Sequence, residues 1–349
     1  MKKLILIGCA LLITACNSIS NKKSASIDKE VNKNNEPKIV NNEFEKKVSI
    51  YFGEDLFTEY LYFEDYYKPV LYPLISTSGK NLTRGYPIDP KPGERVDHPH
   101  HVGHWLNYGD VNGLDFWNNS DAIPADKKDG YGTIYHKSVT VDENSKELIA
   151  VSEWKAPDGN LLIEETTRFQ FSQVGTNRII DRTSSLKAMD NVDLKDNKEG
   201  FLGIRVARAL ELPSNKAEIF TDANGIASDV KVLNNEGVTG NYLSSEGIEG
   251  GAAWGTQARW MTLTGEIENE PVAVTIYDHP ENIGYPTYWH ARGYGLFAAN
   301  PLGVEIFTNG ESKLNLSLPK GDIITFKYRI LLHSGTKQSV EEIESFTKF

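Results

Sequence analysis

The feature that most constrains this sequence is a series of short strand-forming runs separated by turn-forming residues. Side chains of a strand alternate between two faces, and β-branched and aromatic residues suit such a surface. The run Leu56–Phe63 is of this kind, and Gly, Asn, Asp and Pro recur between it and the later runs. The later runs are Thr133–Val141, Leu148–Trp154, Leu161–Phe171, Arg178–Leu186, Phe201–Leu210, Val272–Tyr277, Val304–Phe307, Leu314–Leu318 and Ile323–Leu332.

This pattern also predicts the fold class. Only Ser339–Phe346 has the character of a helix, and no linker interrupts residues 48–349. We therefore expect an all-β protein, a large single β-sandwich of the supersandwich-like type with a short C-terminal helix. Two domains within this body are the alternative.

The first residues have the pattern of an export signal. Met1–Lys3 is basic, Leu4–Ile13 is apolar, and a small residue precedes Cys16. The apolar run is too short to span a bilayer as a permanent helix. Because Ile13–Cys16 matches the bacterial lipoprotein box, we expect residues 1–15 to be a signal peptide and Cys16 to carry lipid, including palmitate. The alternative is an ordinary secretory peptide with an incidental cysteine.

The next segment predicts a tether and a location. Residues 16–47 are rich in Asn, Lys, Ser and Glu, which favours a flexible tether before a catalytic domain at 48–349. Asn17 is not the aspartate associated with inner-membrane retention, and residues 17–23 lack an acidic run. We expect an outer-membrane lipoprotein that faces the periplasm and contacts the membrane only through its lipid.

Cysteine use and charge exclude several functions. With Cys9 in the signal and Cys16 lipidated, the mature chain has no thiol for a disulfide, a thiolate metal site or a nucleophile. Loss of Lys2 and Lys3 moves the formal charge from −11 to −13. An acidic protein of this kind is a poor candidate for binding nucleic acid. An anionic sugar would need a local basic pocket.

Four of the eight histidines lie close together, at His98, His100, His101 and His104. In an extended segment, His98 and His100 would share one face and His101 would point the other way. Neutral imidazoles at this density suit proton transfer, or a divalent metal held by His98, His100 and His101. The alternative is a polar loop in which histidines brace the fold.

Aromatic and acidic residues follow this histidine segment. Trp105 and Trp117 resemble a platform on which a sugar could stack, although tryptophans of a sandwich more often pack in the core. Asp110 and Asp115 lie between them and either cap turns or supply carboxylates. We retain Trp105 and Trp117 as candidates for substrate binding.

A second polar cluster lies far away in the sequence. Asp278-His279-Pro280 repeats the order of Asp97-His98-Pro99. Tyr288, His290 and Arg292 would project from one face if that segment is extended. Arginine grips carboxylates, while histidine and tyrosine move protons. We assign Tyr288 and His290 to catalysis, and His279 and Arg292 to substrate binding; a polar ladder on a solvated face is the alternative.

The segment 199–205 adds a third candidate. At strand spacing, Glu199 and Arg205 would share one face. Arg205 is then a candidate for substrate binding, and a structural ion pair between the two residues is the alternative.

Several long motifs occur in one order along the body. They are FTEY at 57–60, KPVLYPL at 68–74, DHPHH at 97–101, GDVNG at 109–113, EGFLGIR at 199–205, RWMTLTG at 259–265 and PTYWHARGYGLFAANPLG at 286–303. With these motifs the chain resembles the family labelled PmoA-like. His104 is not a position that this resemblance fixes, so it ranks below the other three histidines. The label suggests methane oxidation, but a methane monooxygenase subunit of that kind crosses the membrane several times, whereas this sequence has no spanning helix. We interpret the label as an inherited error.

The resemblance implies a function in carbohydrate use. Within this family, the chain most resembles oligosaccharide dehydratases acting on ulvan, a sulfated algal polymer of rhamnose and uronic acids. Such a carbon–oxygen lyase removes water from the terminal uronic acid and leaves a 4,5-unsaturated sugar. Arg292 or Arg205 could neutralise the carboxylate, a histidine or Tyr288 could take the C5 proton, and another histidine could protonate the leaving hydroxyl. A divalent metal could replace the arginine.

Two further functions stay open from the sequence. A glycoside hydrolase would need paired carboxylates, available among Asp97, Asp110, Asp115 and Glu199. A non-catalytic sugar-binding lipoprotein would be built on tryptophans, namely Trp105, Trp117 and Trp289.

Overall fold

The computed structural model describes Met1, residues 36–142 and residues 144–349. The predicted signal peptide, Cys16 and most of the predicted tether lie outside these residues, so lipid anchoring stays a prediction. Antiparallel strands dominate the described residues, which confirms the all-β class. Within the described residues, no helix is both long and apolar enough to pass through a membrane.

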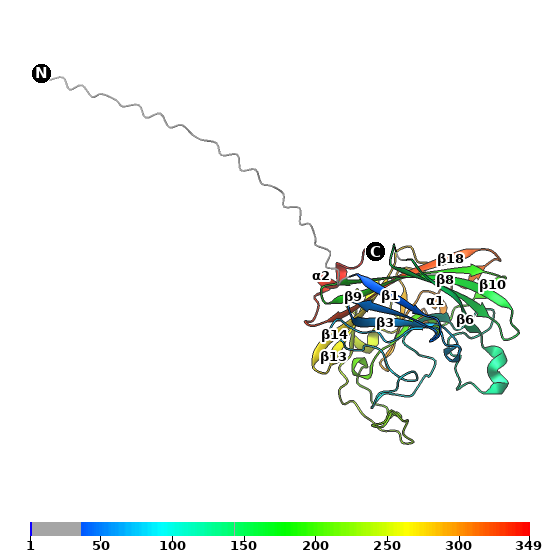
Figure 1. The fold of residues 1–349 in the computed structure, drawn as a ribbon, viewed down its shortest axis with the longest axis horizontal. Helices are drawn as coiled ribbons and strands as arrows, with labels where there is room; N and C mark the ends of the chain where they lie inside the picture. The colour runs from blue at the N-terminus through cyan, green and yellow to red at the C-terminus, as the bar shows by residue number, and fades with distance from the viewer. Residues whose placement is uncertain (2–35, 143) are drawn as a thin grey trace. The chain divides into compact units, whose positions relative to one another are not determined.

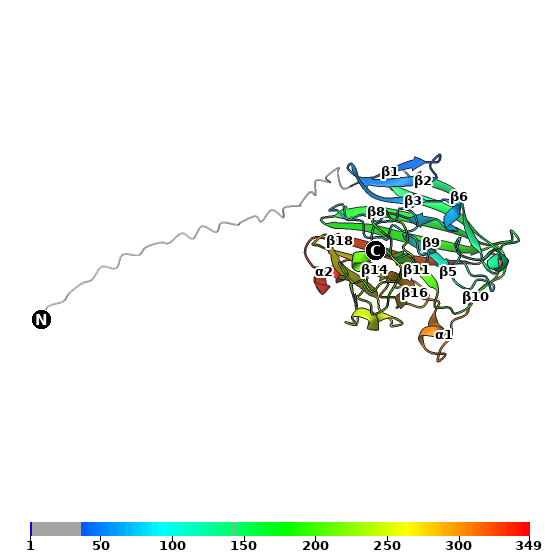
Figure 2. The same cartoon turned by 90° about the horizontal axis from the view of Figure 1, so that it is seen from below.

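Eight strands form the first sheet, in which β5, β11, β16 and β15 follow one another at one side, and Figure 2 labels β5, β11 and β16 close together. In spatial order they are β1 (Pro37–Asn42), β2 (Lys47–Phe52), β3 (Asp55–Leu61), β4 (Val70–Leu71), β5 (His104–Tyr108), β11 (Gly200–Arg205), β16 (Leu296–Asn300) and β15 (Tyr288–Ala291). Strand β1 pairs with β2 along its whole length. The body therefore begins before the predicted boundary at 48, and residues 37–42 belong to the sheet rather than to a tether.

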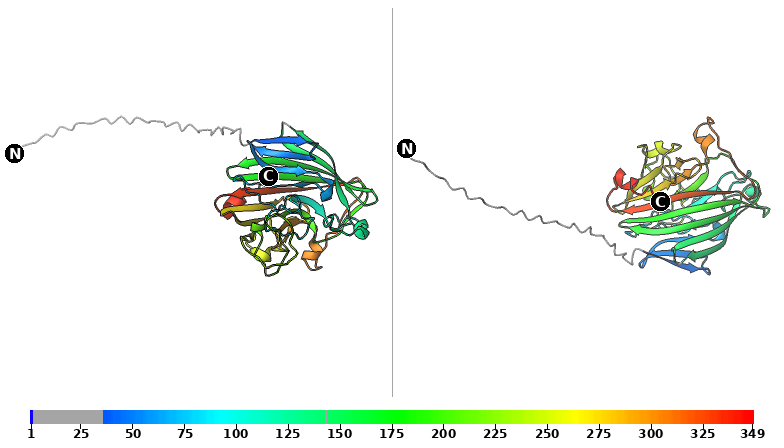
Figure 3. Two further views of the ribbon diagram at one scale, coloured as in Figure 1. Left: turned by 60° about the horizontal axis from the view of Figure 1, so that its bottom comes forward. Right: turned by 90° about the horizontal axis from the view of Figure 1, so that it is seen from above.

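The second sheet also has eight strands, and its longest ones lie side by side in Figure 3. In spatial order they are β12 (Asn241–Ser244), β13 (Trp260–Ile267), β14 (Glu270–Asp278), β18 (Ile323–Ser334), β9 (Asn177–Ala188), β8 (Leu161–Val174), β7 (Glu147–Lys155) and β6 (Thr133–Asp142). A separate pair joins β10 (Val192–Leu194) to β17 (Leu316–Leu318).

Alternation along the strands builds the core between the sheets. On β7, Leu148, Ala150 and Trp154 are buried while their neighbours are partly exposed. They belong to one apolar cluster with Leu106 and Leu202 of the first sheet. Since burying a large apolar side chain contributes about 1.5–3 kcal/mol, this shared cluster holds the two sheets together as a sandwich.

Helices are short and lie at the margins. The predicted C-terminal helix is confirmed as α2 (Val340–Glu344), which begins with a capping box between Ser339 and Glu342. The predicted strand Val304–Phe307 is wrong, because these residues form the one-turn helix α1. The described residues also contain short 3₁₀ turns, namely η2 (Glu64–Tyr66), η3 (Ala125–Gly130), η4 (Arg208–Leu210) and η5 (Gly250–Ala253).

The outer face of the first sheet is also covered. Strands β11 and β16 are buried along their whole length, which requires cover on both faces. The cross-strand register places Trp105, Gly203, Ala298 and His290 in one row across β5, β11, β16 and β15. Figure 1 shows the yellow-green segment between η4 and β12 extending from the side of the sheets. The candidate site is built on this row.

Candidate active site

The buried Arg84 side chain holds the histidine segment in shape. Its guanidinium donates to the backbone carbonyl oxygens of Asp97 (2.7 Å), His98 (2.9 Å) and His101 (3.0 Å). His98 has a φ of 48°, in the left-handed region that non-glycine residues rarely adopt. A backbone of this kind persists where its surroundings fix it, and it is concentrated at functional sites. The segment is therefore a rigid loop rather than a strand.

Asp97 and His98 form a hydrogen-bonded pair at the centre of this loop. The Asp97 Oδ2 lies 2.6 Å from His98 Nδ1, and the Asp97 Oδ1 accepts from Arg205 at 2.7 Å. Burial opposes ionisation of Asp97, but Arg205, the His98 hydrogen bond and Arg84 outweigh it and lower the pKa of the carboxyl group. An ionised Asp97 accepts the Nδ1 proton of His98. Nε2 of His98 is then left free to take up a proton.

Aromatic rings fix the orientation of His98. Its ring lies parallel to His101 at a centroid distance of 4.9 Å and parallel to Tyr294 at 4.8 Å. His101 in turn stacks on Trp105 at 5.3 Å. A Cβ atom on Gly203 would come within 2.7 Å of the Trp105 ring, so only glycine leaves room for this indole across β11. The His98 side chain remains 40% exposed, and a ligand can reach it.

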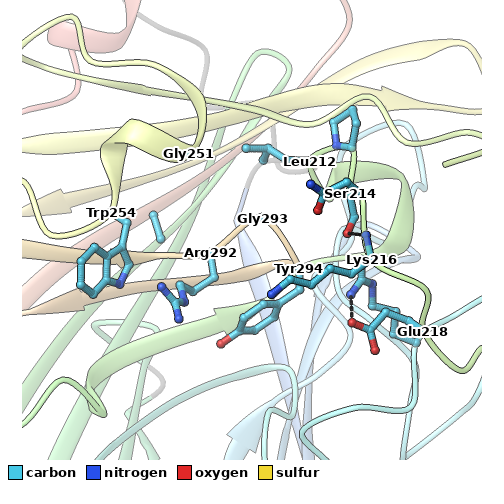
Figure 4. Close-up of a pocket in the computed structure, with 13 residues that line it drawn as sticks. Leu212, Ser214, Lys216, Glu218, Gly251, Trp254, Arg292, Gly293 and Tyr294 are labelled. Carbon is cyan, nitrogen blue, oxygen red and sulfur yellow. Dashed lines mark hydrogen bonds and ion pairs between the residues drawn. The ribbon is translucent and has the colours of Figure 1, made fainter. Parts of the chain in front are cut away.

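An open pocket of about 790 Å³ adjoins the loop, and we call it the arginine pocket. Arg292 and Tyr294, from the tight turn between β15 and β16, form one side of it. Figure 4 shows the Arg292 side chain between Trp254 and Tyr294, and its guanidinium lies 5.2 Å from the Trp254 ring centre. Arg292 is also within hydrogen-bonding reach of the Tyr294 phenol. Burial, partly offset by Arg205 and Arg292, raises the pKa of Tyr294, so the phenol keeps its proton at neutral pH.

His290 and Glu199 lie beside this group. His290 is 1% exposed, and neither of its ring nitrogens has hydrogen-bond geometry with a described neighbour. Its Nδ1 is 3.9 Å from Oε2 of Glu199, whose other oxygen pairs with Lys198. Burial lowers the pKa of His290 to about 3, and Arg292 and Lys198 add to this effect. His290 is therefore neutral at physiological pH.

Sequence comparison identifies the family. The profile of the family of unknown function DUF6807 matches residues 47–348. The chain belongs to this family. A search of functionally curated proteins gives no match for this DUF6807 chain.

Solved structures with a similar arrangement include glycoside hydrolases. The family 36 α-galactosidase AgaB from Geobacillus stearothermophilus is 10% identical with a TM-score of 0.38, over 85% of this chain and 41% of that one. The galactosidase domain of AgaSK, an α-galactosidase–sucrose kinase, is 10% identical with a TM-score of 0.38, over 85% and 42%. A family 97 enzyme from Pseudoalteromonas sp. strain K8 is 10% identical with a TM-score of 0.26, over 86% and 34%. The DUF6807 chain spans less than half of these proteins, and a likeness of this size assigns no activity.

The structure brings together five of the predicted site residues. They are His98, His101, Arg205, His290 and Arg292, and Tyr294 links most of them. Contrary to the expectation for an extended segment, His98 pairs with His101, because the left-handed backbone at His98 turns the chain. His100 faces a different pocket, and Tyr288 stacks on Phe307 at 5.4 Å on the same side as His290.

Four predictions need correction. Trp105 and Trp117 are fully buried under the loop and offer no platform for a sugar. His279 contacts Phe349 at the C-terminus and not the histidine loop. His98, His100 and His101 are not arranged as metal ligands: in residues 36–142 and 144–349, no three His, Cys, Asp or Glu side chains could hold an ion. The parallel rings of His98 and His101 explain why their nitrogens do not converge.

Side-chain contacts define structural roles for His104, Asp110 and Asp115. His104 lies outside the site, since its ring meets Gly203 and Arg182 on the inner side of the sheet. Asp110 and Asp115 accept backbone N–H groups of the following residues, as expected for turn caps. The alternative of an ion pair between Glu199 and Arg205 is not found, because Arg205 pairs with Asp97 and Glu199 with Lys198.

Sequence reasoning missed three contributors, Arg84, Tyr294 and Lys68, and it gave Asp97 a different role. Neither Arg84 nor Tyr294 stands out in the sequence, and the sequence indicates Asp97 only as a carboxylate of a hydrolase. Lys68 also supports the loop, since its buried ammonium donates to the His100 carbonyl at 2.7 Å. The one available signal was the repeated Asp-His-Pro motif, which marked Asp97 beside His98.

The burial of His290 predicts an acid-sensitive contribution to stability. The unfolded chain binds a proton on this residue below pH 6.5, whereas the folded chain does so only near pH 3. Stability from this source is present above pH 6.5 and is lost as the pH falls toward 3. Wild type should lose unfolding free energy when the pH is lowered from 8 to 5. In His290→Gln we expect this loss, measured by urea denaturation, to be about 2 kcal/mol smaller. Equal losses in both proteins would contradict a buried neutral His290.

Proposed function

We propose that this protein is a carbohydrate-active lyase, an oligosaccharide dehydratase that acts on a terminal uronic acid. One observation carries the proposal: the imidazole of the Asp97–His98 pair stacks on Tyr294, and Tyr294 lines an open pocket together with Arg292. This arrangement supplies a proton acceptor, a proton donor and a cation within one group of contacts. The reaction needs these three and no thiol.

The chemistry follows from the acidity of the sugar. The C5 proton of a uronic acid is weakly acidic until its neighbouring carboxylate is neutralised. A base removes this proton, and the electrons of the C5–H bond form the C4–C5 double bond. The C4–O bond breaks, and the departing hydroxyl takes a proton and leaves as water. Atoms and charge balance without an oxidant or a further reactant.

Each requirement matches a side chain of the site. Arg292 is partly exposed in the arginine pocket and would bind the carboxylate. Nε2 of His98 would accept the C5 proton, because Nδ1 is held by Asp97. Tyr294 keeps its phenol proton and would donate it to the C4 hydroxyl. Arg205 and His101 are buried, and they hold the Asp97–His98 pair in position from its buried side. Neither of them contacts the sugar in this proposal.

The competing functions have less support from the described residues. A hydrolase needs a protonated carboxyl group as acid, but Asp97 is held ionised and Asp110 and Asp115 cap turns. The fourth candidate, Glu199, is paired with Lys198. A binding protein built on tryptophans is disfavoured because Trp105, Trp117 and Trp289 are 0% exposed.

The proposal includes the setting expected from the sequence. The similarity to PmoA-like proteins and the lipoprotein signal suggest an ulvan-type oligosaccharide and an anchor on Cys16 in the outer membrane. Radiolabelled palmitate incorporated into wild type but not into Cys16→Ser would support the anchor independently of any activity.

Product analysis tests the reaction. Purified protein is incubated with oligosaccharides that end in a saturated uronic acid. We expect a rise in ultraviolet absorbance from the conjugated double bond, together with loss of the mass of one water molecule from the substrate. Gain of one water with release of reducing sugar would instead identify a hydrolase. No change in absorbance or mass with any uronic-acid substrate would refute both enzymes.

A further inference from the structure

Trp254 differs from the other tryptophans of this protein in its exposure. Five of the six tryptophans are at most 1% exposed, namely Trp105, Trp117, Trp154, Trp260 and Trp289. Trp254 is 36% exposed, and it lines the arginine pocket (Figure 4). Resting on the proposed function, we propose that Trp254 binds the second sugar residue of the oligosaccharide, the one linked to the terminal uronic acid.

The indole of Trp254 is held in place before a ligand arrives. Trp254 follows the 3₁₀ turn η5, whose last residue, Ala253, is fully buried. The next residue, Gly255, donates its N–H group to the Trp289 carbonyl oxygen at 2.8 Å. The indole also packs edge to face with Phe307, at a centroid distance of 5.6 Å and an interplanar angle of 74°. A side chain fixed in this way loses little further entropy when a ligand binds.

The order of side chains along the pocket places the second sugar at Trp254. Arg292 lies between Trp254 and Tyr294 in Figure 4. In the proposed reaction, Tyr294 protonates the C4 hydroxyl and Arg292 binds the carboxylate on C5. Because C1 of a pyranose lies across the ring from C4, the glycosidic bond at C1 leads away from Tyr294. The sugar beyond this bond is therefore on the side of Trp254.

An exposed indole and the size of the pocket both suit a second sugar. An aromatic ring offers an apolar face to the C–H groups of a pyranose. The Trp254 ring keeps its exposure with the Arg292 guanidinium 5.2 Å from the ring centre, so part of the indole is free for a ligand. The pocket volume of about 790 Å³ is that of a site for a drug-sized ligand, which is larger than a monosaccharide.

The charge of the lining fits an anionic oligosaccharide. Among the described lining residues, Arg95, Lys216 and Arg292 are positively charged, whereas Glu218 is negatively charged. A sulfate ester on the second sugar, as in an ulvan-type substrate, would be attracted to this pocket rather than repelled. The platform at Trp254 is therefore compatible with a sulfated sugar as well as a neutral one.

Calorimetry tests the inference without turnover. In the His98→Gly background, the binding of methyl glucuronide is compared with that of a glucuronosyl-rhamnose disaccharide. We expect the disaccharide to bind roughly threefold to tenfold more tightly. Trp254→Ala should remove this gain and leave the affinity for methyl glucuronide within about twofold of the parent, while Trp254→Phe, which keeps an aromatic ring, should retain part of the gain. If Trp254 only supported Arg292, Trp254→Ala would weaken both ligands equally, and the inference would be overturned.

Fluorescence quenching gives a second measurement that needs no change at position 254. Because the other five tryptophans are buried, acrylamide quenches mainly Trp254. The disaccharide should protect the His98→Gly protein from this quenching, and methyl glucuronide at the same occupancy should protect it less. Absence of protection by the disaccharide would contradict the platform, even if Trp254→Ala did not fold.

A matched control is Tyr135→Ala on β6. Tyr135 is 39% exposed and also has a cation near its ring, the Lys155 ammonium at 5.7 Å from the ring centre, but it lies outside the lining of the arginine pocket. This variant should bind both ligands like the parent. Turnover by wild type together with equal affinity for the two ligands overturns the platform alone. A preference for the disaccharide that depends on Trp254, without turnover by wild type, overturns the proposed lyase and keeps the platform.

Discussion

Replacing His98 by glycine is expected to lower kcat for elimination by about 10²–10⁴-fold, the usual contribution of a positioned general base. Glycine suits the φ of 48° at this position, so the change removes the imidazole without straining the loop. It also leaves a space beside the rings of His101 and Tyr294, on which the imidazole stacks. Added imidazole should occupy this space and restore part of the rate. Initial rates of double-bond formation, with and without imidazole, measure both effects.

The matched control for this prediction is His136→Gln. His136 lies on β6 of the second sheet and stacks on Tyr62 at 4.0 Å, away from the histidine loop. This variant should keep the wild-type kcat, and imidazole should not change it. Activity of His98→Gly within threefold of wild type, or its loss without any response to imidazole, would argue against His98 as the base.

The strands of this protein were largely predictable because a local property, the alternation of buried and exposed side chains, determines them. On β7, alternate residues are buried and partly exposed, as the sequence pattern indicates. The error at Val304–Phe307 shows the limit of that property. The Glu305 and Leu314 N–H groups both donate to the Asp196 carboxylate, more than 100 positions away, and this folds the segment into one helical turn. Local strand propensity carries no information about such a contact.

The candidate site was predictable by residue type but not by arrangement. His98 and His290 stand out in the sequence, yet their proximity depends on the register of four strands from distant segments. The pairing of His98 with His101 depends on a backbone conformation that Arg84 fixes through three carbonyl groups. Tyr294 gains its place only from the turn between β15 and β16. None of these has a local signature.

Replacing Arg205 by methionine is expected to destabilise the fold by about 3–5 kcal/mol, the usual result of removing one partner of a buried ion pair. Arg205 is 0% exposed, pairs with Asp97 at 2.7 Å, approaches His101 Nδ1 at 3.3 Å and lies 5.1 Å from the Tyr294 ring centre. Its loss leaves Asp97 with Arg84, at 3.2 Å, as the remaining arginine. Urea denaturation measures the free energy, and elimination rates of the folded fraction should fall as well, because the Asp97–His98 pair loses its support.

Two comparisons separate this positioning role from substrate binding. Arg292→Met should change the unfolding free energy by less than about 1 kcal/mol, because Arg292 is partly exposed, while kcat/KM falls about 10²-fold or more through loss of carboxylate neutralisation. Arg329→Met breaks a more exposed pair with Asp181 at 2.6 Å and should leave kcat unchanged.

Adding Asp97→Asn to Arg205→Met should recover part of the stability, since it removes the carboxylate left unpaired. If Arg205→Met were as stable as wild type, the ion pair would not hold the loop, and the order of the Asp97–His98 pair would have to come from Arg84 alone.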